Sequence, residues 1–530
     1  MSLPDRNNPY NFDAFLEWRE NVDYYADDPF LQKVAAYFAG DEFGKLDPGL
    51  REFSKKVSHR WRKLAEEAAL PENRPFMMHY DGHRRRTDRI VRPMETRVME
   101  REIFGEGLFS DKVPDWERLV KFYLLHQNSE ACIACPMVCT EGLVAVLDRF
   151  ADIPETRRIL KHCKEGIDGD FAIGAQYLSE IQGGSDVPAN LVEAVEEDGV
   201  WKLYGNKFFC SAAHADYAAV TAKPRGSEKV ALFVMPSWED KENEVRNGFT
   251  IDRIKWKMGT SELPTAEITL NGAVAYPVGP LERGLANVVG IVLTYSRLTV
   301  GLSGAAGMAR GYREAEKYTE FREAFGVPIS GFPMVKGQLA RLERMWKRTT
   351  AGAFRIYDEF LRLPGGLRGG IDTDEPLDAR KRRFALRELI MLQKITASWD
   401  AVDACRLAMS LLGGHGVMED FSSLPRFYRD GAVNELWEGP RNVLLTQIHR
   451  DMGRVVQWYP VEDMVRDILE DADPGERDRL AAEAGELISH GHLFSPDEKT
   501  IEVCERWDDF CHDLFHAYQD AALSMVEAGS

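Results

Sequence analysis

Residues 422–442 of the chain read SSLPRFYRDGAVNELWEGPRN. Within this segment Glu438 stands between Trp437 and Gly439, shortly before the helical pattern VLLTQIHRDM. An indole beside a carboxyl group partly excludes water from it, which raises the carboxyl pKa towards that of a useful base. The glycine leaves room for a planar ligand or another backbone to approach. The triplet alone is equally typical of a glutamate at a helix start, so the remaining chain has to decide.

The composition is that of an ordinary globular protein. Of 530 residues, 44% are hydrophobic and 29% charged, and the length allows several domains with a large core. We see neither a secretory signal pattern nor a run of about 18 apolar residues that would span a membrane. Eight cysteines do not make a disulfide scaffold in a chain of this length, so we expect a protein of the reducing cytoplasm.

The negative charge is concentrated near the C-terminus. The chain carries a net charge of −19, and residues 461–530 hold 19 acidic and 5 basic residues. This balance argues against nucleic acid as a partner, since nucleic-acid surfaces are basic. The one basic concentration, HYDGHRRRTDRIVRPMETRVMER from His79 to Arg101, is interpreted as a solvated or subunit-facing helix surface, with a contact for phosphates or another polyanion as the alternative.

Hydrophobic periodicity divides the chain into regions. Residues up to about 170 repeat apolar positions at helical spacing, as in WERLVKFYLL and GLVAVLDRFA. From Phe171 the pattern alternates with period two between glycine-containing turns, which predicts strands. Long helical patterns then return, broken by the glycine-rich loop RLPGGLRGGIDTDEP, which we interpret as a surface excursion between Leu361 and Leu377.

Two motifs invite a functional interpretation that we reject. Cys132, Cys135 and Cys139 have no second cysteine or histidine cluster to complete a four-ligand metal site. We expect these small, soft side chains to share one helix face, and we predict no metal. The glycines of GLSGAAGMARG, from Gly301, follow a helical pattern and no strand, so they predict close helix packing instead of a dinucleotide site.

Several segments together resemble the acyl-CoA dehydrogenase family. They are the Arg429-Asp430 pair before the Trp-Glu-Gly triplet, YLSEIQGGSDV at 177–187, NKFFCSAA at 206–213, FREAFG at 321–326 and SLLGGHG at 410–416. The Leu-Pro-Arg-aromatic-Tyr-Arg opening and the Gln-Gly-Gly spelling are most similar to the AidB-like branch. The resemblance implies a mainly α fold with a central β-domain. Its expected parts are a helical N-terminal domain (1–172), a β-barrel-like middle domain (173–285), a C-terminal four-helix bundle (286–456) and an acidic helical extension (457–530).

The resemblance also implies a set of site residues. Glu438 is the implied catalytic base, and FAD is the implied cofactor. The implied cofactor-binding residues are Leu178, Ser179, Gly184, Ser185, Phe209, Ser211, Arg322, Phe325, Gly413, Gly414 and Asn442. In the family, the segment that matches Arg322 and Phe325 contacts the cofactor of a neighbouring subunit. The implied substrate-binding residues are Ser185, Tyr295 and Arg297. In the family, the helix that matches the three cysteines borders the acyl pocket, so the resemblance implies that their thiols form part of its wall.

The implied reaction is α,β-dehydrogenation of an acyl-CoA to the 2-enoyl-CoA. Glu438 would remove the α-proton while the β-hydride passes to flavin N5, and a hydrogen bond to the thioester carbonyl would stabilise the developing enolate charge. The implied partners are an acyl-CoA substrate, an electron-transfer flavoprotein as acceptor, and identical subunits in a homodimer or homotetramer. We expect no membrane association.

Departures from the family pattern leave two alternatives open. Thr294 and Tyr295 replace an acidic residue and its neighbour, and Pro333, Ser410 and Pro440 replace a glutamine, a glutamine and a hydroxyl residue. One alternative is a flavoprotein oxidase or monooxygenase, although a nitroalkane-oxidase-like enzyme would carry aspartate at position 438. The other is an AidB-like, DNA-associated protective flavoprotein, which would need a basic C-terminal surface.

The acidic extension is predicted to be folded. Val461, Met464, Val465, Ile468 and Leu469 fall on one helix face. A second, wider apolar stripe consists of Cys504, Trp507, Cys511, Leu514, Phe515 and Tyr518. Burying one large apolar side chain contributes about 1.5–3 kcal/mol. We therefore expect both stripes to pack on the bundle or across a subunit interface.

Overall fold

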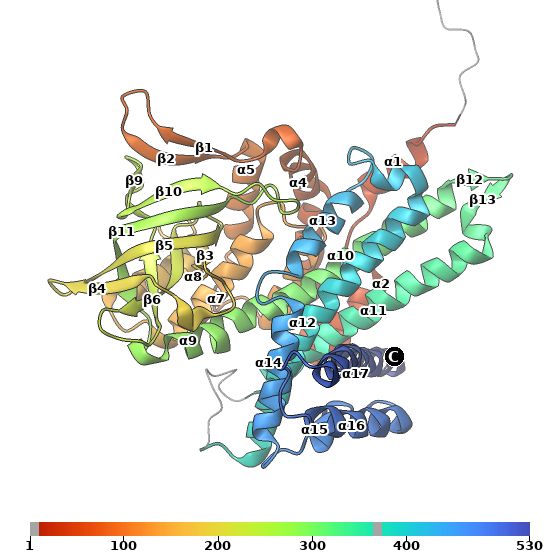
Figure 1. Cartoon of the computed structure of the whole chain (residues 1–530). Coiled ribbons are helices and arrows are strands. Elements are labelled where there is room, and N and C mark those ends of the chain that lie inside the picture. Colours follow the sequence, from red (N-terminus) through yellow and green to blue (C-terminus); the bar gives the residue numbers. More distant parts are fainter. Residues whose placement is uncertain (1–9, 364–373, 530) are drawn as a thin grey trace, which may run out of the picture.

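The computed structural model describes residues 10–363 and 374–529. A sheet domain lies beside a diagonal bundle of long helices, and a further group of helices packs across one side of the bundle (Figure 1). The expected surface excursion after Leu361 falls mainly on residues 364–373, outside the described residues.

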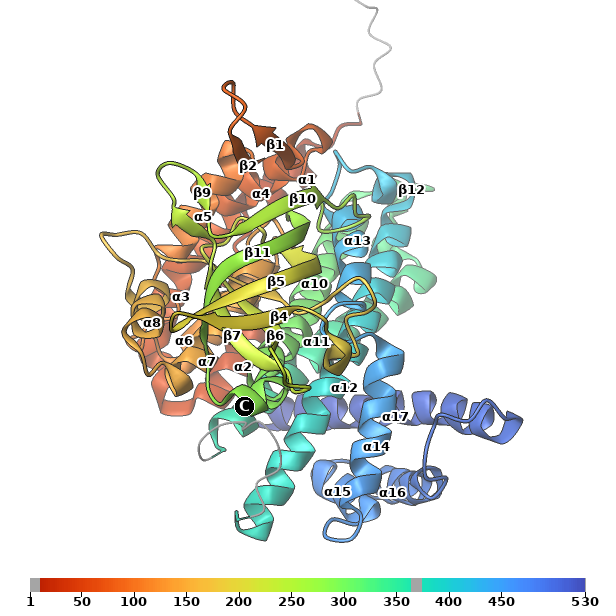
Figure 2. The ribbon, with the colours of Figure 1, turned by 60° about the vertical axis from the view of Figure 1, so that its left-hand side comes forward.

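The N-terminal region consists of helices that pack behind the sheet and along the bundle (Figure 2). Asp28 caps the second of them by accepting a hydrogen bond from Leu31 N, and Pro29 occupies its first position. The helices are α1 (Asp13–Asn21), α2 (Pro29–Ala39), α3 (Phe43–Lys55), α4 (Arg62–Ala68), α5 (Met94–Phe104), α6 (Asp115–His126), α7 (Ala134–Phe150) and α8 (Pro154–Glu165). A π-helical segment, Lys56–Trp61, joins α3 to α4.

A β-hairpin corrects the expectation that this region is wholly helical. Strands β1 (Phe76–Tyr80) and β2 (Arg86–Val91) pair antiparallel and project from the molecule. The segment FMMHY alternates between exposed and half-buried side chains, and Asp81-Gly82 follows it as a turn signal. The alternating segment is only five residues long, so it did not stand out from the helical patterns on either side.

The basic run therefore lies on this hairpin and on α5, and four of its arginines form ion pairs with carboxylates. Arg85 pairs with Asp81 at 2.7 Å, Arg86 with Asp88 at 3.0 Å and Arg92 with Glu100 at 2.5 Å. Arg89 also pairs with Glu244. The other arginines of the run, Arg84, Arg97 and Arg101, are exposed to solvent, so the interpretation as a solvated surface and the polyanion alternative both stay open.

The sheet domain is barrel-like, as expected. Its strands follow the order β10-β11-β5-β4-β6-β3, and β7 pairs with both β11 and β6, which closes a ring. Figure 2 shows β10, β11, β5 and β4 side by side. The strands are β3 (Gly174–Tyr177), β4 (Glu193–Glu197), β5 (Val200–Ser211), β6 (Tyr217–Pro224), β7 (Ala231–Pro236), β10 (Phe249–Ile254) and β11 (Thr265–Pro277), with the small pair β8 (Trp238–Asp240) and β9 (Val245–Arg246) outside the ring.

The bundle is built around α10. The helical stretch Leu281–Phe321, which includes α10, is long and apolar enough to cross a membrane. Its apolar window is mostly buried inside the protein, as in a core helix. Gly304 permits close packing, because a Cβ there would lie 2.6 Å from the Ala397 carbonyl oxygen. The elements are α9 (Gly284–Asn287), α10 (Leu293–Phe321), β12 (Glu323–Ala324), β13 (Val327–Pro328), α11 (Pro333–Leu361), α12 (Leu377–Leu412), α13 (Leu424–Asn434) and α14 (Arg441–Val455).

The acidic extension forms α15 (Val461–Ile468), α16 (Pro474–Ile488) and α17 (Glu498–Ala528). Both predicted apolar stripes are packed inside. All their residues are buried except Cys504, which is partly exposed. Helix α17 lies across α11 and α12, and Gly352 of α11 contacts Gln519 so closely that a Cβ would approach within 2.8 Å. The extension therefore docks on the bundle of its own chain.

Candidate active site

Glu438 lies in the turn between α13 and α14, residues 435–440, which we call the Glu438 turn. Glu438 has a φ of 59°, in the left-handed region that non-glycine residues rarely adopt, and Gly439 follows with a φ of 100°. A Cβ at position 439 would lie 2.9 Å from Leu444 Cδ2. The turn therefore requires the glycine of the Trp-Glu-Gly triplet.

Two buried cations contact this turn. The Arg297 Nε donates a hydrogen bond to the Glu438 carbonyl oxygen at 3.0 Å. The Lys394 Nζ donates to the carbonyl oxygens of Glu435 and Gly439, each at 2.8 Å. Arg297 was expected to bind substrate, and its contact with the turn places it beside the implied base. Lys394 was not identified from the sequence, because it lies on α12, far from the turn in the chain.

The surroundings of Glu438 favour a base of raised pKa. Burial raises the pKa of its carboxyl group above the ordinary value, and the positive charges of Arg297 and Lys394 oppose that rise. A carboxylate whose pKa lies nearer to neutrality accepts a proton more readily from a weak acid. Glu438 is thus suited to general-base chemistry.

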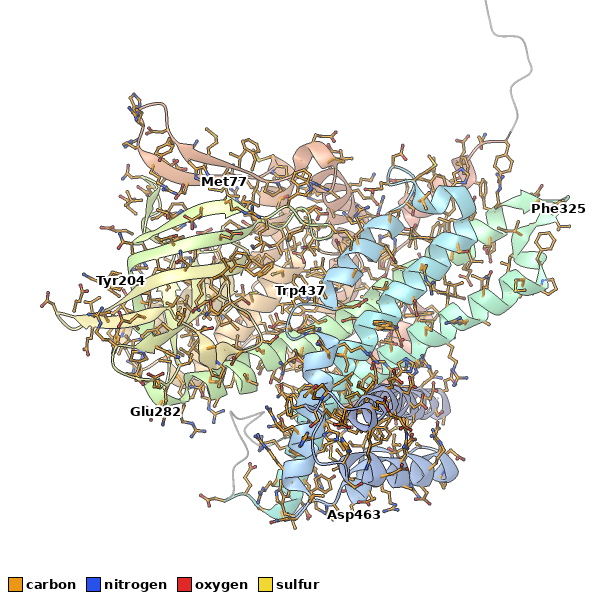
Figure 3. The ribbon with its side chains drawn as sticks, in the orientation of Figure 1. Met77, Tyr204, Glu282, Phe325, Trp437 and Asp463 are labelled. Atoms are coloured by element: carbon orange, nitrogen blue, oxygen red, sulfur yellow. The ribbon has the colours of Figure 1, made fainter. Side chains whose placement is uncertain are left out.

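Glu438 and Trp437 line a cavity of about 60 Å³. Figure 3 shows Trp437 where the bundle meets the sheet domain. The Nε1 of Trp437 is buried and has no hydrogen-bond partner among the described residues. Small side chains of α7, α10 and α12 form much of the wall, including Cys135, Cys139, Val300, Gly304, Ala401 and Cys405. The cavity can thus admit a small organic group next to the Glu438 carboxylate.

The cysteines agree with the predicted wall in part. Cys135 and Cys139 lie one turn apart on α7, with their Sγ atoms 3.8 Å apart, and both line the cavity. Cys132 precedes α7 and has a φ of 58°, so it does not share their helix face. The helix begins only at Ala134, after a turn that the cysteine spacing did not predict.

Asp430 connects the cavity to the sheet domain. Its carboxylate accepts hydrogen bonds from Ser129 Oγ at 2.6 Å and from Thr260 N at 2.5 Å. Glu130 lies nearby, and burial followed by the charge of Asp430 raises its pKa to about 8. Arg429, the other member of the Arg-Asp pair, forms an ion pair with Glu419 away from the cavity. Asp430 therefore joins the cavity to the sheet domain, whereas Arg429 makes an ion pair at the surface.

One group of the implied cofactor residues gathers at the end of the sheet that meets α13. Phe208 N donates to the Ser179 carbonyl oxygen at 3.0 Å, which fixes the segment from Leu178 to Ser185 beside β5. Ser211 follows on β5 and pairs with Thr265. Gly259, between β10 and β11, would clash with Arg429 if it carried a Cβ, the nearest atom being 2.3 Å away. This region, with Ser179, Ser185, Phe209 and Ser211, therefore borders the part of the bundle that carries Asp430.

The second group lies at the far end of the bundle. Phe325 is 97% exposed at the tip of the β12–β13 hairpin, well away from Trp437 (Figure 3). Arg322 stacks over the Tyr10 ring, and an aromatic cluster of Phe12, Phe321 and His415 continues from there to the diglycine Gly413-Gly414. Within one chain, this second group is not brought together with Glu438.

The remaining implied residues lie near the base or behind it. Asn442 is in the first turn of α14 and is exposed. Tyr295 lines a separate, water-sized space of about 10 Å³ with Arg118 and Glu141. Burial raises the pKa of Glu141 to about 7 in that space. The substrate-binding role of Tyr295 stays a prediction.

Comparison with family models decides the class of the protein. Residues 175–273 match the acyl-CoA dehydrogenase middle domain, and residues 282–453 match the acyl-CoA dehydrogenase C-terminal domain. The chain belongs to the acyl-CoA dehydrogenase family. Membership confirms the resemblance, the fold class and the assignment to the oxidoreductases.

Among curated relatives, acyl-CoA dehydrogenase family member 11 of Caenorhabditis elegans is 28% identical over 448 residues, which are 80% of this chain and 70% of the relative. The putative acyl-CoA dehydrogenase AidB of Escherichia coli K12 is 26% identical over 409 residues, 73% of this chain and 71% of the relative. An AidB relative is therefore among the matches, as the motifs indicated.

Solved acyl-CoA dehydrogenase-like structures share the whole fold. The apo form of Bd2924 has a TM-score of 0.82 at 23% identity, covering 96% of this chain and 99% of that one. The ACDH-11 of Caenorhabditis elegans in complex with C11-CoA has a TM-score of 0.77 at 22% identity, covering 95% and 91%. An acyl-CoA dehydrogenase of Bacillus anthracis complexed with FAD has a TM-score of 0.65 at 14% identity, covering 96% and 90%.

Proposed function

We propose that the protein is an FAD-dependent acyl-CoA dehydrogenase in which Glu438 removes the α-proton of the acyl thioester. The observation that carries the proposal is the position of Glu438: a carboxylate of raised pKa, on the wall of a cavity, in a turn fixed by two buried cations. Glutamate at this position separates the chain from a nitroalkane-oxidase-like enzyme.

The residues of the chain divide the work as follows. Trp437 and the small side chains of α7 and α10 exclude water from the Glu438 carboxylate, and Glu438 accepts the α-proton at a carboxylate oxygen. Arg297 and Lys394 hold the backbone of the turn, so that the carboxylate keeps its direction while its charge changes. Preorganisation of this kind lowers the barrier because little rearrangement is needed at the moment of proton transfer.

The residues at the end of the sheet fit a flavin. A Cβ at Gly184 would lie 2.5 Å from Ser179 Oγ, so the loop is open only because glycine stands there. Phe209 offers a half-exposed ring, and Lys255 lies above it with Nζ 4.3 Å from the ring centroid. These features suit a planar ring with polar edges, held by Leu178, Ser179, Gly184, Ser185, Phe209, Ser211 and Asn442. FAD, when bound, supplies the acceptor for the β-hydride.

The second group of residues supports a cofactor shared between subunits. Arg322, Phe325, Gly413 and Gly414 lie away from Glu438 in their own chain. An arginine at such a place suits a phosphate oxygen of the cofactor in a neighbouring subunit. We therefore expect a homodimer or homotetramer in the cytoplasm. An electron-transfer flavoprotein, a kind of protein also found among structural neighbours, is the expected electron acceptor.

The substrate is proposed to be an acyl-CoA, in line with the C11-CoA complex of ACDH-11. The test is a panel of acyl-CoAs, straight-chain, ring-containing and dicarboxylic, assayed with an artificial electron acceptor. We expect a yellow protein that releases FAD on denaturation and reduces the acceptor with at least one acyl-CoA. A protein that takes up no FAD on reconstitution would overturn the proposal. Tight binding to duplex DNA at physiological salt, with a steep salt dependence, would instead favour the protective-protein alternative.

A further inference from the structure

The backbone carbonyl groups around Glu438 are held from outside the turn. The Glu435 and Gly439 oxygens accept hydrogen bonds from Lys394 Nζ, and the Glu438 oxygen accepts one from Arg297 Nε. Lys394 therefore binds backbone carbonyl groups on both sides of Glu438, that of the third residue before it and that of the residue after it. Arg297 binds the backbone carbonyl group of Glu438 itself.

Lys394 is an unusual choice for such a contact. Its side chain is 0% exposed on α12, and among the described residues no carboxylate lies within ion-pair distance of its Nζ. Burying a lysine without a paired carboxylate opposes folding, since the ammonium loses its hydration. A carbonyl clamp alone could be made by a neutral amide. The use of lysine therefore indicates that the positive charge itself contributes to the properties of the site.

The charged groups that face Lys394 come from two neighbouring elements. The Glu438 turn contributes Glu438 and Glu435, and α10 contributes Arg297. Burial is the largest cause of the shift and lowers the pKa of the Lys394 ammonium to about 7; Glu438 opposes that change and Arg297 adds to it. Its neighbour on α12, Glu388, has its own pKa raised to about 7 by burial and lies close to Arg297. Lys394 thus faces the Glu438 carboxylate, and its charge changes near neutral pH.

We propose that Lys394 is a positioning residue of the dehydrogenase site, which holds the Glu438 turn in its left-handed conformation and sets the electrostatic field at the Glu438 carboxylate. The proposal rests on the proposed function for its catalytic part. A neutral amine retains two N–H groups, one for each carbonyl, so the clamp persists in both protonation states. The charged form adds a field that stabilises the carboxylate. Clamp and field are therefore separable properties of one side chain.

The first test needs no substrate. Lys394→Met removes the donors and the charge but keeps the unbranched stem. We expect amide hydrogen exchange in residues 435–440 to accelerate about 10-fold or more, because two hydrogen bonds to a charged donor are lost. The matched control is Lys381→Met, the same change on the same helix about 20 Å away along its axis. Unchanged exchange rates of residues 435–440 in Lys394→Met would show that Lys394 does not hold the Glu438 turn.

The second test measures the field. We expect kcat of Lys394→Met to fall about 10-fold or more, with the Kd for acyl-CoA within about threefold of the wild-type value, since Lys394 is not among the residues that line the cavity. The acidic limb of the kcat/KM profile should move to higher pH, because a neighbouring cation no longer favours the Glu438 carboxylate. If Lys394 had only a structural role, the acidic limb would stay in place. An unchanged limb would therefore show that the charge of Lys394 does not act on the Glu438 carboxylate.

A second variant covers a failure of Lys394→Met to fold. Lys394→Gln keeps one N–H donor group without charge, so it should retain FAD and still show the displaced acidic limb; a wild-type profile in this variant would overturn the field. A wild-type protein that turns over no acyl-CoA would overturn the proposed function. The exchange rates of residues 435–440 would still decide the clamp in that case, so the two failures are distinguishable.

Discussion

Two turns of this protein have nearly the same backbone and opposite surroundings. Glu438-Gly439 in the Glu438 turn and Phe325-Gly326 at the tip of the β12–β13 hairpin both have positive φ at successive residues, 59° and 100° in the first pair and 54° and 84° in the second. Phe325 is fully exposed, and its turn is closed by ordinary strand pairing between Ala324 and Val327. Glu438 is only partly exposed, although Leu436 of the same turn is 66% exposed, and the turn is held by hydrogen bonds from the buried side chains of Arg297 and Lys394.

The difference shows how the protein fixes a strained residue beside a cavity. On the surface, water solvates the free carbonyl groups, and the turn type is a normal hairpin solution. Where water is partly excluded, a carbonyl group needs a donor from the protein. The chain supplies two cationic donors, whose positive charges also act on the carboxylate of Glu438. Both turns have a left-handed residue, and only the Glu438 turn combines it with buried cations.

The largest expected effect comes from removing the carboxylate. Glu438→Gln should keep the fold and FAD but lose about 10²–10⁴-fold in kcat/KM with the best acyl-CoA, the usual range for a general base. Glu435→Gln is the matched control, because Glu435 belongs to the same turn but does not line the cavity. Turnover of Glu438→Gln within a few-fold of wild type would show that another group is the base.

A pair of glycine substitutions compares the two turns directly. Gly439→Ala should lower the free energy of unfolding by about 2–4 kcal/mol, because left-handed strain adds to the contact with Leu444. Gly326→Ala should lower it by about 1–2 kcal/mol, since nothing lies within 4 Å of a Cβ there. Urea unfolding of both variants measures the difference. Equal losses of unfolding free energy in the two variants would mean that the contact between position 439 and Leu444 adds no constraint to the Glu438 turn.

The support of the Glu438 turn should also respond to pH. The folded-state pKa of Lys394, about 7, lies below that of an unfolded lysine, so the unfolded chain binds more protons between about pH 7 and pH 10. The penalty for burying the ammonium is therefore greatest below pH 7 and is relieved as the pH rises. We expect the stability of wild type relative to Lys394→Met to increase from pH 7 to pH 9.5. A constant difference would contradict the shifted pKa.

The smallest effect is expected at the exposed turn. Phe325→Asn should change the free energy of unfolding by no more than about 0.5 kcal/mol, because asparagine tolerates a positive φ and the ring is exposed. If the ring meets the cofactor of a neighbouring subunit, as the family resemblance implies, the purified variant should retain less FAD. Absorbance at the flavin band gives the ratio of FAD to protein. Full FAD retention would remove Phe325 from the cofactor site.

Much of the fold and part of the site could be predicted from the sequence. Periodicity located the sheet region and the packed faces of α15 and α17, and local motifs located Glu438 and its glycine. The hairpin at 76–91 was missed because a five-residue strand is too short to stand out from helical neighbours. Cys132 was misplaced because a helix start without a side-chain cap gives no sequence signal.

Lys394 could not have been found by the same means. It lies 44 positions before Glu438, on a helix rich in ordinary charged residues, and its partners are backbone carbonyls that carry no sequence identity. Arg297 was found only through a family motif, and the motif did not indicate that its hydrogen-bond partner is the Glu438 backbone. Contacts from side chains to distant backbone groups are a general limit on sequence reasoning.

The position of α17 has a consequence for biosynthesis. Asp508 of this helix pairs with Arg441, the first residue of α14 after the Glu438 turn, and Lys33 of α2 donates to the Glu527 carbonyl oxygen near the other end of α17. The Glu438 turn thus leaves the ribosome before α17 does. At about 5–20 residues per second, the 60 to 90 residues in between take about 3 to 18 s to be translated. During that interval Arg441, next to the turn, lacks its partner Asp508, so the ion pair between α14 and α17 forms only when almost the whole chain has been made.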